Sequence, residues 1–474
     1  MTKTLAPIRF GTDGWRAVIG QEYTFANVER VAQAYASYLS DQVQSTGATL
    51  VVVGYDRRFL SERFAQRACE VLVGNGLRVA LFPHDCPTPL ISWAVKVLQA
   101  VGGVVITASH NPFDFNGFKI KAPWGGSAAP ETTVQVEALV DQFPLKLAEV
   151  NSAGEDLLGP AVESYRQQIE SYIDLERLRT ARGAVVIDPM HGAGGRWVEG
   201  FLSGGTLLVE TIRAYRDPLF GGVNPEPIDR NLSLLKQRVV ADRALLGLAT
   251  DGDADRVGAV DENGRTMTMH DVVPLLLLHL ARNRNMTGGV VRTFSQSILT
   301  ARIATELGLP LYETPIGFKY IADLMLSEDI LIGAEESGGI GVKGHIPERD
   351  GILNSLLFLE AVVTAGKPPS EMLRDLHKEF GEFHFGRRDL HVEVARGREL
   401  VSQLAEKPPS KFVDEQVVNV STVDGTKLEF QDETWLLFRQ SGTEPVLRIY
   451  CEATSIAKMN RLLDGGVALA AALS

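Results

Sequence analysis

The sequence has few residues that could link the chain covalently. It contains three cysteines, Cys69, Cys86 and Cys451, which are widely spread and odd in number. This argues against a disulfide framework, and the spacing does not match a metal site. The cysteine usage is typical of a reducing compartment.

Long apolar runs are also missing. The most apolar run, Val272–Leu280, is interrupted by Pro274 and His279 and is too short to span a bilayer. The N-terminal segment contains Arg9, Asp13 and Arg16 around a short apolar patch and shows no signal-peptide core. We therefore expect no membrane association and a cytoplasmic location.

The sequence also lacks an excess of positive charge. The net charge is -12, and the isoelectric point is near 5.4. This balance argues against a broad nucleic-acid surface, so any anionic substrate must be attracted by local clusters of Arg and Lys. Hydrophobic residues make up 45% and charged residues 22%, which is ordinary for a soluble globular protein. A cytoplasmic enzyme is the expected class.

A strand–helix–strand pattern recurs three times along the 474 residues, a length that suits three or four domains. The segments are Val51–Gly54, Ser61–Val73 and Arg78–Phe82; Ala184–Asp188, Gly195–Leu202 and Thr206–Thr211; and Val290–Thr293, Ile298–Leu307 and Leu311–Glu313. Short β-branched runs that end near glycine indicate buried strands. The pattern predicts three related α/β domains.

The last hundred residues do not follow the strand–helix–strand pattern. We expect alternating strands at His391–Val394 and Trp435–Phe438, followed by a terminal helix. This predicts a smaller α+β fourth domain. The expected domains cover residues 1–150, 151–264, 265–370 and 371–474.

Each α/β repeat is followed by a polar loop that leaves an apolar strand. The first loop contains Ser109, the second is Asp251–Arg256, and the third is Glu335–Gly339. Ligands of open α/β sheets bind where loops leave the carboxyl ends of strands. The three loops therefore predict one composite site.

Ser109 has two interpretations. A serine directly after a strand can be an exposed nucleophile, but a serine turn that closes the loop explains this segment equally well. Lys119 follows the turn at Asn116–Gly117 and could neutralise a phosphoryl oxygen or donate a proton.

The second loop carries three carboxylates at alternate positions, Asp251, Asp253 and Asp255. Such a cluster can converge on a hard cation through oxygen ligands. A calcium loop would use Glu262 at its twelfth position, but Arg256 occupies the sixth, which requires glycine. A solvated acidic turn is disfavoured because the loop is entered from an apolar run. We favour Mg²⁺, with a serine-bound phosphate as a further oxygen ligand.

Two further segments suggest ligand contacts. Arg439–Pro445 with Arg448 offers guanidinium, hydroxyl and backbone N–H groups, which suit an anion cradle, although a hairpin turn with a flanking arginine is the alternative. Glu335 and Ser337 could bind a polyol, but a polar surface loop explains them better by themselves. No complete nucleotide-binding glycine motif is present, and His191–Gly195 is interpreted as a strand-to-helix turn.

Together with Phe10–Arg16, these loops resemble the α-D-phosphohexomutase family, which includes phosphoglucomutases and phosphomannomutases. The resemblance runs nearly end to end, with five motifs in the same order. It implies an isomerase with a four-domain α/β fold, in which three related α/β domains and a smaller α+β C-terminal domain surround a central cleft. The fourth domain carries the phosphate-binding loop.

The resemblance also implies site residues. Ser109 carries the transferred phosphoryl group, and Ala254 stands where the family's metal loop usually has glycine, a change expected to leave the ligands undisturbed. The implied catalytic residues are Ser109, Lys119, Arg16 and His110; the metal ligands are Ser109, Asp251, Asp253 and Asp255. The implied substrate-binding residues are Glu335, Ser337, Gly317, Lys319 and Arg256; the phosphate-binding residues are Arg439, Ser441, Gly442, Thr443 and Arg448.

Two departures from relatives with dual specificity bear on the substrate. Phe318 and Gly339 stand where those relatives often have histidine. This favours a phosphoglucomutase that uses Mg²⁺, with glucose 1,6-bisphosphate as intermediate and activator, and it makes Lys119 the better candidate for proton transfer. The alternatives are a phosphomannomutase, a glucose 1,6-bisphosphate synthase, a metal-dependent phosphatase and a non-catalytic sugar-phosphate regulator. The expected partner is a small phosphosugar, and the expected state is a monomer or homodimer.

Overall fold

The computed structural model describes residues 7–11, 13–150, 154–442 and 445–472. The chain forms two compact units. The first unit contains the described residues up to Thr266 together with Gly338–Pro369, and the second contains Met267–Ser337 together with the described residues from Ser370 onward. Within the described ranges, no helix has the length and apolar character needed to cross a membrane.

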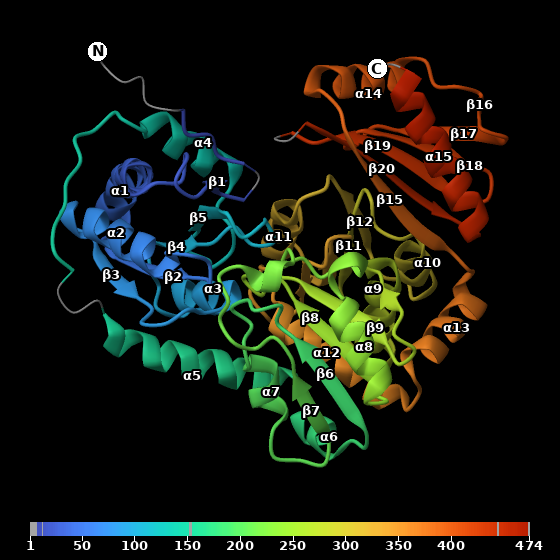
Figure 1. Cartoon of the computed structure of the whole chain (residues 1–474), viewed down its shortest axis with the longest axis horizontal. Coiled ribbons are helices and arrows are strands. Elements are labelled where there is room, and N and C mark those ends of the chain that lie inside the picture. Colours follow the sequence, from blue (N-terminus) through green and yellow to red (C-terminus); the bar gives the residue numbers. More distant parts are fainter. Residues whose placement is uncertain (1–6, 12, 151–153, 443–444, 473–474) are drawn as a thin grey trace. The chain divides into compact units, whose positions relative to one another are not determined.

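The first sheet has the strand order β1-β5-β4-β2-β3 (Figure 1). Its strands are β1 (Trp15–Val18), β2 (Leu50–Tyr55), β3 (Arg78–Leu81), β4 (Gly102–Ile106) and β5 (Phe115–Lys121), and its helices are α1 (Phe25–Thr46), α2 (Ser61–Gly74), α3 (Thr88–Val97) and α4 (Pro130–Leu139). Val51 and Val53 of β2 pack into the core that α1 and α2 complete, whereas Gly54 contacts Ile91 of α3. Both faces of β2 are therefore covered, which explains its unbroken apolar run.

The second sheet has the order β10-β9-β8-β6-β7. Its strands are β6 (Ala184–Asp188), β7 (Leu208–Thr211), β8 (Leu246–Thr250), β9 (Val257–Asp261) and β10 (Thr266–Met267). The helical segments around it are α5 (Glu155–Tyr172), α6 (Leu175–Thr180), α7 (Trp197–Leu202), the 3₁₀ turns η1 (Phe220–Gly222) and η2 (Asp229–Asn231), α8 (Ser233–Ala241) and α12 (Gly351–Ala365). Gly247 of β8 lies against Val239 of α8, and α12 also packs on β8 and β9. α12 is buried along most of its length, and most of its residues are accordingly apolar.

The second unit begins with three parallel strands in the order β12-β11-β13. The strands are β11 (Gly289–Thr293), β12 (Leu311–Thr314) and β13 (Ile330–Ala334), and the helices are α9 (Met269–Leu278), the π-helical η3 (His279–Asn283), α10 (Ile298–Glu306) and α11 (Phe318–Ser327). After the third polar loop, the chain continues into β14 (Ile340–Val342) of the first unit.

The remaining sheet is antiparallel, with the order β15-β20-β19-β18-β17-β16 (Figure 1). Its strands are β15 (His384–His391), β16 (Lys411–Phe412), β17 (Glu415–Ser421), β18 (Thr426–Phe430), β19 (Trp435–Gln440) and β20 (Val446–Ala453), and its helices are α13 (Pro369–Phe380), α14 (Val394–Glu406) and α15 (Ile456–Ala472). Leu436 and Phe438 pack beneath α14 and α15, whereas Trp435 and Leu437 pack with Phe294 on the opposite face.

The predicted α/β class, with three related domains and a smaller α+β domain, is confirmed, and each of the nine predicted repeat segments overlaps an element of the expected type. The predicted strand at His391–Val394 is wrong, because β15 ends at His391 and α14 begins at Val394. The spacing of Gly397, Leu400 and Leu404 places them on one buried helical face, and this longer pattern overrides the short alternation.

Glu452 holds the α+β sheet to the α/β part of the second unit. This buried carboxylate of β20 accepts hydrogen bonds from His270 Nδ1 at 2.9 Å, Ser297 Oγ at 2.6 Å, the Ile298 amide at 2.8 Å and Trp435 Nε1 at 3.0 Å. Burial alone would raise the pKa of Glu452, but His270 and the hydrogen-bond donors lower it below its usual value. Four donors thus compensate for the loss of water around the carboxylate.

We predict that Glu452→Gln destabilises the second unit by about 3 kcal/mol. The substitution replaces one accepting carboxylate oxygen with an amide NH₂ group, which faces the hydrogen-bond donors that surround this side chain. The folded pKa is lowered, so the carboxylate stabilises the fold above its unfolded pKa. This stabilisation disappears as the pH falls through the folded pKa. Scanning calorimetry at neutral and acidic pH should show a difference from wild type that shrinks in acid. Glu429→Gln is the matched control on β18, and equal unfolding temperatures for the two variants would contradict the assignment.

Candidate active site

The serine loop follows β4, at the carboxyl end of a central strand. Ser109 is buried and has a positive backbone φ of 52°, which is uncommon for a residue other than glycine. Its amide donates to Thr107 Oγ1 at 2.9 Å, and Thr107 in turn donates to Asp56 at 2.6 Å. The strained serine is therefore fixed by a chain of hydrogen bonds.

A buried arginine braces the same loop. Arg58 donates to the carbonyl oxygens of Ser109 and Asn111, each at 2.7 Å, and to that of Pro112 at 2.6 Å. Its own charge is balanced by Asp56 at 3.1 Å. A rigid guanidinium fork that collects several carbonyls keeps the loop from relaxing into a more common turn.

The metal-loop candidates converge directly beside Ser109. Asp251, Asp253 and Asp255 are all buried, and their ligand atoms lie within 4.8 Å of one another. Ser109 Oγ donates to Asp251 Oδ2 at 2.8 Å. The loops approach so closely that a Cβ on Gly252 would lie 2.3 Å from the Ser109 carbonyl oxygen, so only glycine fits there.

Two buried cations balance these carboxylates. Lys119 Nζ lies 2.9 Å from Asp253 and 3.3 Å from Asp255, and it also contacts Asp13 at 3.0 Å. Arg349 lies 2.9 Å from Asp255 and 2.8 Å from Asp13. The cluster is a closed network of opposite charges, which is the condition for burying so many ionised groups.

The electrostatic balance is uneven within the loop. Burial, together with Asp255 and Asp253, raises the pKa of Asp251 well above its usual value. Burial would also raise the pKa of Asp253, but Lys119, together with Thr88 and Arg349, lowers the pKa of that carboxyl below its usual value. The pKa of Lys119 is raised, because its three carboxylate partners outweigh the opposing effect of burial. Negative charge is therefore least compensated at Asp251, next to the serine hydroxyl.

The donor set fits a hard divalent cation. Among the described residues, none donates a hydrogen bond to Oδ1 of Asp253 or to Oδ1 of Asp255, although both atoms are buried. Buried carboxylate oxygens without donors are expensive unless a cation completes them. Three convergent carboxylates and one hydroxyl oxygen are ligands that Mg²⁺ accepts.

Three more predicted residues surround the serine loop. Arg16 of β1 donates to Asn111 Oδ1 at 2.7 Å, and His110 Nδ1 lies 3.4 Å from Ser109 Oγ. Burial, then Arg256 and Arg16, lower the pKa of His110 well below its usual value. Arg256 Nε lies 3.9 Å from Asp255.

Ala254, which precedes Asp255, has a backbone φ of 60°. Alanine therefore occupies a left-handed backbone position for which glycine is better suited.

The predicted phosphate-binding arginines lie in the second unit. Arg439 of β19 and Arg448 of β20 are direct partners in the antiparallel register, and the Ser441 amide closes the turn by donating to the Val446 carbonyl at 2.9 Å. Like charges directly opposite one another destabilise a sheet, so this pair suits an anionic ligand. Gly442 has open space around its Cα, whereas Thr443 lies outside the described residues.

The predicted sugar-contacting residues belong to two turns of the second unit. Glu335 and Ser337 follow β13, and the neighbouring Glu336 accepts a hydrogen bond from Ser295 at 2.7 Å. Gly317 precedes α11 with a φ of 141°, and Lys319 in the first turn lies 4.8 Å from the centre of the Tyr320 ring.

Sequence reasoning missed three charged residues that contact the carboxylate cluster or the serine loop, namely Asp13, Arg349 and Arg58. Asp13 lies in the Phe10–Arg16 motif but received no role, and Arg349 lies in a short charged run before an apolar helix. Arg58 follows β2, so the rule that loops at strand ends carry function would have included it. For Asp13 and Arg349 no local pattern reveals the partner.

Comparison with known proteins shows matches along the whole chain. The phosphoglucomutase/phosphomannomutase family models match as alpha/beta/alpha domain I at residues 7–144, domain II at 163–264, domain III at 270–380, and the C-terminal domain at 390–466. A phosphoglucomutase/phosphomannomutase of Thermococcus kodakarensis is 33% identical, with 97% of this chain and 98% of that protein covered. A probable phosphoglucosamine mutase of Pyrococcus abyssi is 31% identical, with 96% of each covered.

A solved structure agrees with these sequence relatives. The crystal structure of a Thermus thermophilus protein, provisionally named a phosphomannomutase, shares 38% sequence identity with this chain. The two structures superpose with a TM-score of 0.86, and the match covers 98% of this chain and 99% of that one. With all four domains matched and relatives above 30% identity over nearly the full length, the chain belongs to the phosphoglucomutase/phosphomannomutase family and is a phosphohexomutase enzyme.

Proposed function

We propose that the protein is a phosphoglucomutase that interconverts glucose 1-phosphate and glucose 6-phosphate through a phosphoserine at Ser109. The observation that carries this proposal is the Ser109 hydroxyl, held 2.8 Å from Asp251 at the edge of a buried carboxylate cluster. A strained serine beside a cation-binding carboxylate group suits the reversible acceptance of a phosphoryl group.

The proposed reaction conserves phosphate. Phosphorylated Ser109 gives its phosphoryl group to O6 of glucose 1-phosphate, so the bond from phosphorus to the serine oxygen breaks, a bond to O6 forms, and the O6 proton is released. The resulting glucose 1,6-bisphosphate reorients, and its C1 phosphoryl group passes back to Ser109, where the C1 oxygen regains a proton. Glucose 6-phosphate then leaves. If Ser109 loses its phosphoryl group, added glucose 1,6-bisphosphate can phosphorylate it again.

Residues of the first unit would stabilise the transferring group. Phosphoryl transfer depends mainly on positioning and charge stabilisation. Arg16 and Arg256 carry positive charge beside the serine loop, and Lys119 is fixed within the carboxylate cluster. Ser109 and the three aspartates would hold Mg²⁺, which supplies additional positive charge to the phosphoryl oxygens. His110, a neighbour of the serine hydroxyl, is a further catalytic candidate.

Residues of the second unit would hold the phosphate that is not reacting. Arg439 and Arg448 supply paired guanidinium groups, and the turn that follows β19 offers the Ser441 hydroxyl and the Gly442 backbone N–H. On the basis of the sequence motif, Thr443 would also bind this phosphate. For the sugar itself, the assigned contacts are Glu335, Ser337, Gly317 and Lys319.

The choice of glucose rests on two positions. Phe318 is buried at the start of α11, and Gly339 has no side chain, so neither offers a polar group that could adapt to a different substituent at C2. Glucose and mannose phosphates differ only in the orientation of the C2 hydroxyl. Phosphoglucosamine mutase is the second candidate function, because the relative from Pyrococcus abyssi carries that name.

Coupled assays on glucose, mannose and glucosamine 1-phosphates test this choice. We expect the highest kcat/KM for glucose 1-phosphate and measurable activity on mannose 1-phosphate, since a hydrogen-bond mismatch at C2 costs about 1–3 kcal/mol. Equal values for glucose and mannose would contradict the preference, and a higher value for glucosamine would establish the second candidate. Net release of glucose 1,6-bisphosphate without isomerisation would indicate a synthase, and no turnover at all would indicate a regulator.

The metal assignment predicts that Asp253→Asn weakens Mg²⁺ binding about tenfold or more and lowers activity with it, because a neutral amide replaces an anionic ligand. Titration calorimetry with MgCl₂ measures binding independently of turnover. Glu262→Gln is the control, since Glu262 would be a ligand only in a calcium loop. Unchanged Mg²⁺ affinity in Asp253→Asn, or full activity of the wild type in excess chelator, would refute the assignment.

A further inference from the structure

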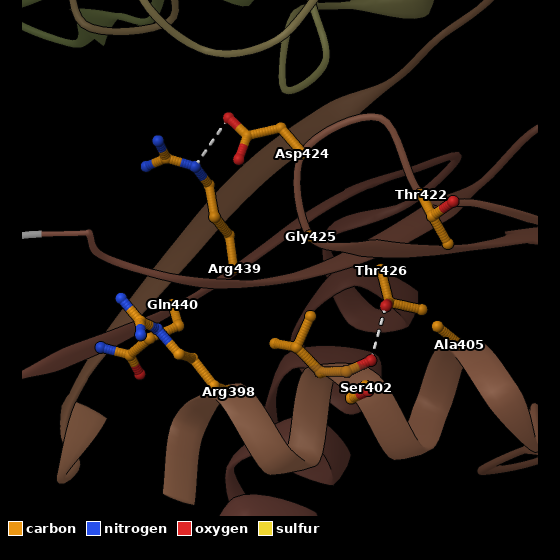
Figure 2. A pocket seen from close by; sticks show the side chains of 10 residues that line it. Arg398, Ser402, Ala405, Thr422, Asp424, Gly425, Thr426, Arg439 and Gln440 are labelled. Carbon is orange, nitrogen blue, oxygen red and sulfur yellow. Dashed lines mark hydrogen bonds and ion pairs between the residues drawn. The ribbon is translucent and has the colours of Figure 1, made fainter. Parts of the chain in front are cut away.

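We propose that Asp424 is a positioning residue that joins the phosphate-binding arginine of the second unit to the loop that contacts the sugar. The inference rests on the proposed function and assigns a role that the sequence motifs do not include. Asp424 Oδ2 accepts two hydrogen bonds of 2.9 Å, one from Arg439 Nε and one from the Ile316 amide. Figure 2 shows the contact with Arg439.

The turn that carries Asp424 is built to lie against β19. Asp424 and Gly425 connect β17 to β18, and Gly425 has a φ of 96°. A Cβ on Gly425 would lie 2.3 Å from the Phe438 carbonyl oxygen and 3.2 Å from Arg439 Cβ. Only glycine permits both the left-handed backbone and this close approach, which brings the Asp424 carboxylate within reach of Arg439.

The contact with Arg439 uses the inner nitrogen of the guanidinium. Because Nε donates to Asp424, the two terminal nitrogens lie on the side away from the carboxylate (Figure 2). Terminal guanidinium nitrogens are the ones that bind a phosphate in two-point fashion. Burial alone would lower the pKa of Arg439, but Asp424, together with Tyr450 and Glu336, raises it above its usual value. Asp424 therefore both aims the arginine and reduces its repulsion from Arg448 across the strand pair.

Packing alone does not fix the arginine. Arg439 lines an open cavity of about 320 Å³, which Arg398 and Ser402 of α14 also line (Figure 2). A long side chain beside open space loses conformational entropy when it is held in one rotamer, so a specific ionic contact is needed to keep it there.

The second hydrogen bond reaches the turn between β12 and α11. The Ile316 side chain packs against a cluster that includes Trp435 and Tyr450, and its amide donates to Asp424. Gly317, a predicted sugar contact, is the next residue. One carboxylate oxygen thus fixes the backbone at the sugar loop and the side chain of the phosphate anchor, so that the distance between these two substrate contacts is constant within the second unit.

A double-mutant cycle in the full-length enzyme tests the link, with KM and kcat measured for glucose 1-phosphate in the presence of Mg²⁺ and glucose 1,6-bisphosphate. We expect Asp424→Ala to raise KM about tenfold, in line with the loss of one charge-assisted contact, and to change kcat less. In the Arg439→Ala background, the same substitution should raise KM by no more than about twofold, because its target is gone. More glucose 1,6-bisphosphate should escape during turnover of Asp424→Ala.

The controls separate positioning from folding. Asp414→Ala removes an exposed acid from the preceding turn and should leave KM unchanged. Asp424→Asn keeps an acceptor for the Ile316 amide and loses the charge beside Arg439. Its KM should also rise, so this variant tests the inference even if Asp424→Ala fails to fold. Wild-type KM in Asp424→Asn, or equal effects of Asp424→Ala in both backgrounds, overturns the inference while the proposed function stands. A wild-type enzyme that turns over no hexose 1-phosphate overturns both.

Discussion

The structure of the first unit depends on the burial of three aspartates whose ligand atoms lie within 4.8 Å of one another. Such a group is tolerated only when opposite charge is close, and Lys119 and Arg349 provide it from distant parts of the chain. The compensation is incomplete, because the pKa of Asp251 remains raised by burial and by its two neighbours. The least compensated carboxylate is the one that accepts the Ser109 hydrogen bond, which relates the electrostatics of the fold directly to the proposed chemistry.

The α/β framework supplies the precision that this cluster requires. Ser109 and the aspartates leave the ends of β4 and β8, two central strands with covered faces, and Gly252 allows their loops to touch. In the second unit, a different framework positions positive charge: the antiparallel register sets Arg439 opposite Arg448. Regular backbone geometry thus places acids and cations where flexible loops alone could not hold them.

Much of the fold could be predicted from the sequence because its signals are local. Short β-branched runs gave the strands of the three repeats, and alternating acids after an apolar strand indicated the metal loop. The charge partners could not be predicted, since Asp13 and Arg349 are separated by more than three hundred positions and only tertiary structure joins them. The same applies to Asp424, whose turn is ordinary in sequence but lies beside Ile316 in the fold. At His391–Val394, four residues of alternation were too few to distinguish a strand from the start of a helix.

The central claim, that Ser109 carries the transferred phosphoryl group, is tested most directly by locating that group. The enzyme is incubated with glucose 1,6-bisphosphate carrying radiolabelled phosphate, and its proteolytic peptides are mapped. The account predicts a single labelled peptide containing Ser109, loss of the label when unlabelled glucose 1-phosphate is added, and no labelling of a folded Ser109→Ala variant. Label on another residue, or label on Ser109 that substrate does not remove, would contradict it.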